Sequence, residues 1–161
     1  MNDWKSFYEK ISEIKFTMLV THGESGAMQA RPFTTQAAGR DGAVWFFTRM
    51  DSDAVKDVQR DAKVLLCYAD TDKNRFISSA GTATLSHDRQ LIKELWSPVY
   101  TAFFPKGMDD PELVLLRVEI SRADIWDSDK SKMAQMLTIA KAAAGLKVEL
   151  HALGEHEVLK K

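Results

Sequence analysis

A chain of 161 residues, 45% hydrophobic and 28% charged, has the composition of an ordinary globular protein and the length of one domain. This composition argues against a disordered or repetitive chain. With 22 basic and 23 acidic residues the formal net charge is -1, so no overall positive field draws in DNA, RNA or an anionic membrane. The single Cys67 lies in an apolar run, where we expect a small buried residue rather than half of a disulfide.

No segment has the pattern of a targeting signal or a membrane span. Residues 1–10 are polar and amphipathic rather than a basic segment followed by an apolar run, and no later apolar stretch is long enough to cross a membrane. We therefore expect a cytoplasmic protein whose partners include neither nucleic acid nor a membrane.

The first predicted element is an amphipathic helix. Asn2 or Asp3 can cap its start, and its apolar residues recur at helical spacing, at Trp4, Phe7, Tyr8, Ile11 and Ile14. We expect this apolar stripe to pack on the rest of the protein rather than to line a cofactor site.

Three strands are predicted to follow this helix. Residues 16–21 and 28–35 are rich in strand-forming residues and flank a turn at 23–26, and a second turn at 39–42 precedes a third strand at 44–47. Because short turns join consecutive strands, we expect these three to form an antiparallel meander.

The third strand, Val44-Trp45-Phe46-Phe47, leads through a polar turn into a helix that begins at Ser52. The start of a helix presents unpaired N–H groups, which attract anions. With the hydroxyls of Thr48 and Ser52, and a charge from Arg31 or Lys56, this junction has the composition of a phosphate site at the end of a barrel strand.

A simpler interpretation of the same junction remains open. Serine is a common helix cap, so capping alone accounts for Ser52. Asp51 and Asp53 flank the turn and would repel an anion, although both suit the dipole of the helix.

The second half of the chain continues the β pattern with two further helices. Gly81 interrupts the longest strand and indicates a bulge or a barrel corner, and Ser86 or Asp88 can cap the first of these helices. The predicted elements are a helix at 52–60, strands at 63–68 and 75–85, a helix at 88–96, an aromatic loop at 103–107, a strand at 113–120 that continues through 123–127, and a helix at 131–144 stopped by Gly145.

Five or more short strands with helices inserted at two points favour a small closed barrel, which leaves no exposed sheet edge. No linker separates a second domain, so we assign residues 1–127 to the barrel and residues 128–161 to a helical extension of the same domain, with charged last residues that fray. Apolar residues remain on the first helix and in the aromatic loop, and they favour a homodimer.

Other kinds of site find little support in the sequence. The four histidines, His22, His87, His151 and His156, are far apart, and no cysteine or carboxylate joins them at a metal-ligand spacing. No phosphate loop and no nucleophile with a flanking signature are present. We therefore expect no metal site and assign no catalytic residue.

Many short motifs, each weak alone, occur in the order typical of one family. They are Ala30-Arg31-Pro32, Trp45-Phe46-Phe47-Thr48, Asp51-Ser52, Lys73-Asn74-Arg75, Gly81-Thr82-Ala83, Asp88-Arg89, Glu94-Leu95-Trp96, Phe104-Pro105-Lys106-Gly107, Asp109-Asp110-Pro111 and Ile125-Trp126-Asp127. Over residues 4–127 the chain resembles the pyridoxamine 5′-phosphate oxidase-like FMN-binding split barrels, specifically their bacterial general stress protein branch.

The resemblance implies a mainly β fold with peripheral helices, a six-stranded antiparallel split β-barrel, which dimerises with two flavin sites at the dimer interface. FMN is the implied cofactor, with FAD as an alternative. The implied flavin-binding residues lie along the whole barrel: Arg31 on the phosphate or ring edge, Pro32 and Phe33 along the isoalloxazine, Phe47 and Thr48 on the strand that leads to the junction, and Ser52 at the phosphate.

Three tryptophan and phenylalanine residues complete the implied site. Trp126 matches an aromatic residue that approaches the flavin from the partner subunit in the oxidases. Trp96 and Phe104 border the open side of the ring, or else they serve as core or interface residues, as large aromatics often do.

The chain departs from this branch at one position. The branch commonly has Ser-x-Lys at the junction, with the lysine on the phosphate, whereas this chain has Ser52-Asp53-Ala54. One lost charge-assisted contact corresponds to roughly 1.5–3 kcal/mol, or about one to two decades of affinity. Lys56 either compensates from the next turn or faces solvent, and in the second case flavin binding is weakened or lost.

The leading hypothesis is a flavin-binding general stress protein with a flavin-dependent redox role, in which the chemistry is that of the flavin. The pyridoxine phosphate-binding residues of true oxidases are not recognisable, so that activity is not expected. The alternative is a split barrel that binds flavin weakly or not at all and acts as a ligand-binding or interaction module. Similar barrels also hold haem or a deazaflavin, but no residue here argues for either.

Overall fold

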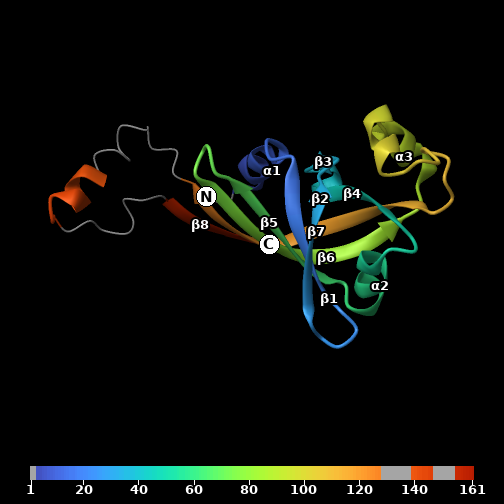
Figure 1. Cartoon of the computed structure of the whole chain (residues 1–161), viewed down its shortest axis with the longest axis horizontal. Coiled ribbons are helices and arrows are strands. Elements are labelled where there is room, and N and C mark those ends of the chain that lie inside the picture. The colour runs from blue at the N-terminus through green and yellow to red at the C-terminus, as the bar shows by residue number, and fades with distance from the viewer. Residues whose placement is uncertain (1–2, 128–138, 147–154) are drawn as a thin grey trace.

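The computed structural model describes residues 3–127, 139–146 and 155–161 (Figure 1). The helical elements are α1 (Trp4–Ser12), the 3-10 helix η1 (Arg40–Gly42), α2 (Asp53–Arg60), α3 (Arg89–Leu95) and the 3-10 helix η2 (Pro98–Ala102). The strands are β1 (Phe16–His22), β2 (Met28–Thr34), β3 (Ala37–Ala38), β4 (Ala43–Arg49), β5 (Lys63–Asp70), β6 (Arg75–Ser86), β7 (Leu113–Asp127) and β8 (Glu155–Lys160).

All strands belong to one antiparallel sheet that curls around the core (Figure 1). The order along the sheet is β2-β1-β5-β6-β7-β4-β3, with β8 also paired to β7. The six long strands β1, β2 and β4–β7 correspond to the six strands of the predicted split barrel. The mainly β fold class with peripheral helices is therefore confirmed.

The predicted meander of the first three strands is wrong in its last step. β1 and β2 form a hairpin, but β4 pairs with β7 and the short β3 rather than with β2. Six of the seven residues of β4 are buried, whereas β2 is largely exposed. A strand buried on both faces needs an apolar neighbour, and the first four residues of β7 are all buried.

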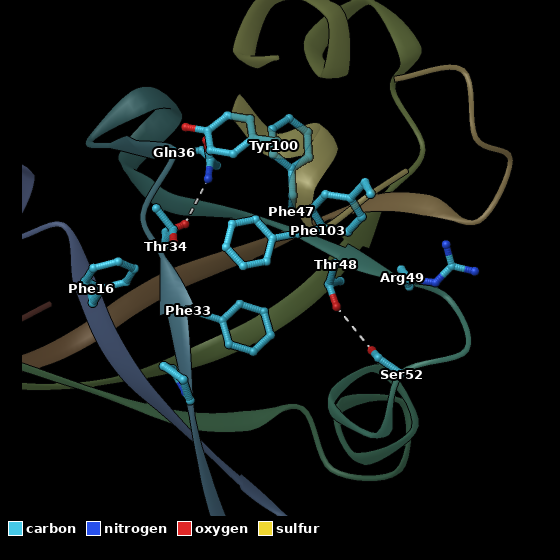
Figure 2. A pocket seen from close by; sticks show the side chains of 12 residues that line it. Phe16, Phe33, Thr34, Gln36, Phe47, Thr48, Arg49, Ser52, Tyr100 and Phe103 are labelled. Atoms are coloured by element: carbon cyan, nitrogen blue, oxygen red, sulfur yellow. Dashed lines mark hydrogen bonds between the residues drawn. The ribbon is translucent and has the colours of Figure 1, made fainter. Parts of the chain in front are cut away.

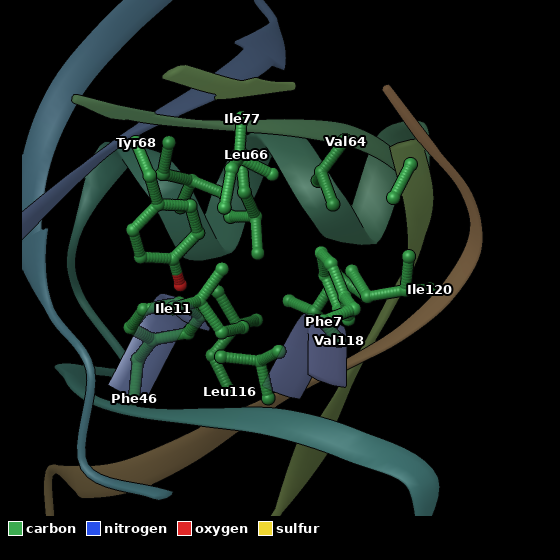
Figure 3. Close-up of a cluster of buried hydrophobic side chains, with 14 of the residues drawn as sticks. Phe7, Ile11, Phe46, Val64, Leu66, Tyr68, Ile77, Leu116, Val118 and Ile120 are labelled. Carbon is green, nitrogen blue, oxygen red and sulfur yellow. The ribbon is translucent and has the colours of Figure 1, made fainter. Parts of the chain in front are cut away.

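The barrel core forms where α1 lies against the sheet. Phe7 and Ile11 of α1 are fully buried beside Phe46, Leu66 and Leu116 (Figure 3). The side chain of Asp3 accepts a hydrogen bond from the Ser6 N–H and caps α1. The apolar stripe of the first helix thus serves for packing, as expected.

Gly81 is the point where the two longest strands change register. The pairing of β6 with β7 shifts between Ala80 and Gly81. A Cβ at Gly81 would lie 2.3 Å from the carbonyl oxygen of Glu119, closer than any real contact. The predicted bulge is confirmed, and glycine is required because the backbone of β7 occupies the space of a side chain.

The C-terminal extension is not wholly helical. Residues 139–143 are helical and Gly145 ends this helix with φ 74°, whereas residues 131–138 of the predicted helix lie outside the described residues. Residues 155–160, expected to fray, form β8 along β7, with Leu159 buried. The charged residues around Val158 and Leu159 concealed this strand in the sequence. The predicted boundary at residue 127 between the barrel and its C-terminal extension stays a prediction.

Candidate functional site

An apolar cavity of about 320 Å³ opens beside the junction of β4 and α2. Aromatic rings come to it from three separate parts of the chain: from β1 and β2, from β4, and from η2 and the loop that follows it (Figure 2). Its volume lies at the lower end of the range of small-molecule sites, and such sites are mostly apolar with a few polar groups.

The alternation of side chains along β4 creates this arrangement. Phe46 faces the barrel core, where it meets Phe33 edge to face at a centroid distance of 5.7 Å. Phe47 points to the other side, into a second cluster beneath α3 and η2, where it contacts Tyr100 and Phe104. Because successive residues of a strand face opposite ways, one strand supplies both clusters.

The polar end of the cavity is the start of α2. The hydroxyls of Thr48 and Ser52 lie 3.1 Å apart (Figure 2). The Val55 N–H donates to the Ser52 hydroxyl at 3.3 Å, so Ser52 caps α2. The predicted cap is confirmed, and the hydroxyls of Thr48 and Ser52 lie together at one end of a largely apolar cavity.

Six of the ten predicted flavin-binding residues line this one cavity: Pro32, Phe33, Phe47, Thr48, Ser52 and Phe104. Residues far apart in the sequence, at positions 32 and 104, are thus brought together. Their proposed contacts with a flavin stay predictions.

The other four predicted residues, Arg31, Lys56, Trp96 and Trp126, do not line the cavity. Trp96 lies one layer behind it, edge-on to Phe47 at 5.7 Å, and supports that ring. Lys56 is exposed and lies 3.5 Å from Asp53.

Trp126 lies away from the cavity, on the outer face of the sheet. Its ring stacks on His156 of β8 at a centroid distance of 4.8 Å. It borders a separate surface hollow with Met18 and Phe76 and is 43% exposed. Within one chain, Trp126 therefore does not meet the other predicted residues.

Arg31 is held by a buried carboxylate. Its guanidinium donates to Asp57 at 3.3 Å, to Thr21 at 2.9 Å and to Gln29 at 2.8 Å. Burial alone would raise the pKa of Asp57, but hydrogen bonds from Thr21 and Arg31 and the charge of Arg31 outweigh it. The net effect lowers the pKa of Asp57, so this carboxylate is charged at neutral pH.

Arg49 borders the cavity and is held in the same way. Its guanidinium donates to Asp110 at 2.9 Å and to Asp51 at 3.0 Å. The Asp110 carboxylate is fully buried, and it also accepts a hydrogen bond from the Glu112 N–H. The backbone hydrogen bond from Glu112, followed by the contact with Arg49, holds the pKa of Asp110 below its usual range in spite of burial.

Six cavity-lining residues were not predicted as site residues from the sequence: Phe16, Thr34, Gln36, Arg49, Tyr100 and Phe103. The sequence contains a signal that could have identified Phe16 as a site residue. Phe16 lies with Met18 on the exposed face of β1, while Thr17 and Leu19 face inward. An apolar pair on an outward face indicates a contact surface. Phe103 is 70% exposed and belongs to the predicted aromatic loop.

The residues present fit a planar aromatic ligand better than a strongly charged one. The apolar end of the cavity presents the rings of phenylalanine and tyrosine residues. The polar end presents two hydroxyls and the start of α2, and the cations next to it already have carboxylate partners. In the described part of the chain, no three His, Cys, Asp or Glu side chains are grouped as metal ligands would be, and no helix is long and apolar enough to cross a membrane.

Comparisons with known proteins agree with this fold. The family model "Pyridoxamine 5'-phosphate oxidase like" matches residues 2–148. A general stress FMN/FAD binding protein from Xanthomonas citri is 29% identical, with a TM-score of 0.68 over 91% of this chain and 96% of that one.

A putative general stress protein 26 from Jannaschia sp. CCS1 covers 100% of both chains with a TM-score of 0.76 at 24% identity, which supports the fold. Protein bli-3 of Neurospora crassa is 24% identical over 152 residues, which are 87% of this chain and 70% of that protein. With a family model that spans nearly the whole chain, the protein belongs to the pyridoxamine 5′-phosphate oxidase-like family.

Proposed function

We propose that this protein binds a flavin, FMN or FAD, in the cavity beside the start of α2, and that it serves a flavin-dependent redox role of the general stress protein kind. The observation that carries the proposal is a cavity with aromatic walls and two hydroxyls at one end, built from the segments that the family resemblance singles out. The similar protein from Xanthomonas citri is described as FMN/FAD binding, which supports the same ligand class.

The proposed roles follow from the position of each side chain. Phe33 and Phe47, with Pro32, form the wall against which the isoalloxazine ring lies, and Phe104 closes that wall from the loop. Thr48 and Ser52 hydrogen-bond the polar side chain of the flavin. The bound flavin supplies the electron transfer, while these residues orient it and exclude water.

Of the two residues expected to border the open side of the ring, Phe104 lines the cavity and Trp96 does not. Trp96 acts through its contact with Phe47 rather than by lining the cavity itself. The residues that bind pyridoxine phosphate in true oxidases are not recognisable in this sequence, so we do not propose the activity of a true pyridoxamine phosphate oxidase.

We also propose that two copies of the chain associate through the outer face of the sheet. Four large apolar side chains are exposed on β1, β6 and β7, namely Phe16, Met18, Phe76 and Trp126. Phe16 borders both this face and the cavity, so a second copy seated there would cover the apolar surface and lie at the cavity mouth. In that assembly Trp126 of the partner subunit is the proposed aromatic neighbour of the flavin, and the expected cytoplasmic location is unchanged.

A flavin titration tests the ligand class. The purified protein is mixed with FMN, FAD and riboflavin, and flavin fluorescence is followed to saturation. Phe103→Ala removes an exposed cavity ring and should weaken binding about 2- to 12-fold, since aromatic contacts contribute about 0.5–1.5 kcal/mol. Val99→Ala is the matched control, because Val99 is similarly exposed on η2 but does not line the cavity.

A folded protein that stays colourless and takes up none of the three flavins would refute the flavin proposal. The interaction-module alternative would then be favoured, and Ala54, buried where the branch commonly has lysine, already points in that direction.

Sedimentation tests the dimer. We expect twice the chain mass of 18.1 kDa, and a shift toward the single-chain mass in Phe76→Asp. Met108→Asp is the control, since Met108 is exposed in the loop that precedes β7 and does not lie on β1, β6 or β7. A monomeric wild-type protein would contradict the proposed assembly.

A further inference from the structure

We propose that the cavity binds flavins with little regard to their phosphate group, because carboxylates of the protein already neutralise the cations around its polar end. This inference rests on the proposed flavin function and specifies the ligand feature that the site recognises: the ring system and the hydroxylated chain rather than the phosphate.

The first step is the pairing of charges at the junction of β4 and α2. Four cations on β2, β4 and α2 each have a carboxylate partner: Arg31 with Asp57, Arg49 with Asp110 and Asp51, Lys56 with Asp53, and Arg60 with Asp57. These four cations therefore face four carboxylates, and together the eight groups present no net positive charge to an incoming dianion.

The second step is that the two pairs nearest the cavity cannot exchange partners without loss. Asp57 is 5% exposed and the Asp110 carboxylate is fully buried. If Arg31 or Arg49 turned to a phosphate, a buried carboxylate would lose one of its charged contacts, and the cost of that loss would offset the benefit of binding the phosphate. Contacts with Arg31 or Arg49 therefore add little to the binding free energy of an anionic ligand.

The third step concerns Arg31, which directly precedes the cavity residues Pro32 and Phe33. Asp57 lies on the same helix as Ser52, five residues further along, and accepts hydrogen bonds from Thr21 at 2.6 Å and from Arg31 at 3.3 Å. The Asp57 carboxylate therefore already binds Arg31, the cation that the sequence suggested as a phosphate ligand.

The remaining groups at this end attract a dianion weakly. Ser52 and Thr48 offer neutral hydroxyls, and the start of α2 carries Asp51 and Asp53, whose charges oppose an anion. Lys56 is exposed to water, where its attraction is screened.

The test compares FMN with riboflavin, which differ only in the phosphate, by fluorescence titration of the full chain. In the wild type we expect the two dissociation constants to agree within about threefold, and the FMN constant to change less than about threefold between low and high salt. A free charge-assisted contact would instead separate the two flavins by roughly one to two decades.

Asp57→Asn removes the resident charge but keeps an oxygen that accepts from the Thr21 hydroxyl. We expect it to tighten FMN about tenfold while riboflavin stays within about twofold, because Arg31 becomes available. Asp61→Asn is the matched control: it makes the same charge change at the end of the same helix, but Asp61 faces His22 instead of Arg31. Both flavins should bind this control as they bind the wild type.

FMN bound tenfold or more tightly than riboflavin by the wild type would overturn this inference and leave the flavin proposal standing. Equal FMN affinity in a folded Asp57→Asn and the wild type would overturn the role of Asp57. If Asp57→Asn does not fold, as judged by circular dichroism, the wild-type ratio and salt dependence decide. Failure of every flavin to bind would overturn the proposed function, and this inference with it.

Discussion

Replacing Ser52 by alanine separates the two roles assigned to this residue, helix cap and ligand contact. In the structure the Ser52 hydroxyl accepts the Val55 N–H at 3.3 Å and lies 3.1 Å from the Thr48 hydroxyl. Ser52→Ala leaves the Val55 N–H without its cap, at the start of a helix of only eight residues.

The loss of one cap of this kind costs about 1 kcal/mol in the free energy of unfolding, with a range of about 0.5–2 kcal/mol. For a chain of this length, 1 kcal/mol lowers Tm by about 2–4 °C. A neutral hydrogen bond from Ser52 to a flavin would add a separate loss of about 2- to 13-fold in affinity. The first effect is measured by thermal and urea unfolding without ligand, the second by flavin titration.

Two further variants make the result specific. Ser52→Asn keeps a side-chain oxygen that can cap the helix while removing the hydroxyl, so it should retain stability and lose only the ligand contact. Ser97→Ala is the structural control, because Ser97 occupies the equivalent position of η2 with no side-chain cap hydrogen bond. If Ser52→Ala were as stable as the wild type, the assigned cap would be refuted. If it bound flavin normally, Ser52 would be a cap alone.

Three other outcomes can be measured on the free protein. Phe47→Ala should destabilise it by about 3–5 kcal/mol, because the buried ring contacts Tyr100 and Phe104, and urea unfolding that showed less than about 1 kcal/mol would contradict this packing. Gly81→Ala should lower the urea midpoint, because the added Cβ would meet the Glu119 carbonyl oxygen. In an ordinary strand the same change would raise stability, since alanine is favoured there over glycine by about 0.5–1 kcal/mol. An unchanged or raised midpoint would therefore count against the bulge geometry. Acid should weaken the fold through Asp57: its pKa is lower in the folded state than in the unfolded chain, so its contribution is present above the unfolded value of about 3.9 and is lost as pH falls through the folded value. Urea midpoints at about pH 7 and pH 3 should therefore differ less for Asp57→Asn than for the wild type, and equal pH dependence would show that Asp57 does not contribute.

Much of the local structure could be predicted from short patterns. Asn2 or Asp3, and Ser52, were expected to cap helices, and Gly81 was expected to mark a bulge or a barrel corner. Each of these features depends on a few neighbouring residues or on the special backbone of glycine. The family resemblance also singled out six residues that line one cavity, because ordered motifs carry information on positions that composition does not.

Long-range pairing could not be predicted in the same way. β4 was expected beside β2, but it lies beside β7, and β8 was not expected at all. Periodicity shows which residues of a strand face the core, but it does not show which strand lies alongside, since that depends on competition among all apolar strands for burial.

The six long strands, the helix starts, the bulge and the family were thus determined by sequence alone. Only the tertiary structure decided that Phe16, Tyr100 and Phe103 join the cavity and that Arg31 meets Asp57. The physical reason is distance along the chain: hydrogen-bonded caps and alternation act over a few residues, whereas a cavity wall and a buried ion pair form only when the sheet has curled and brought remote segments into contact.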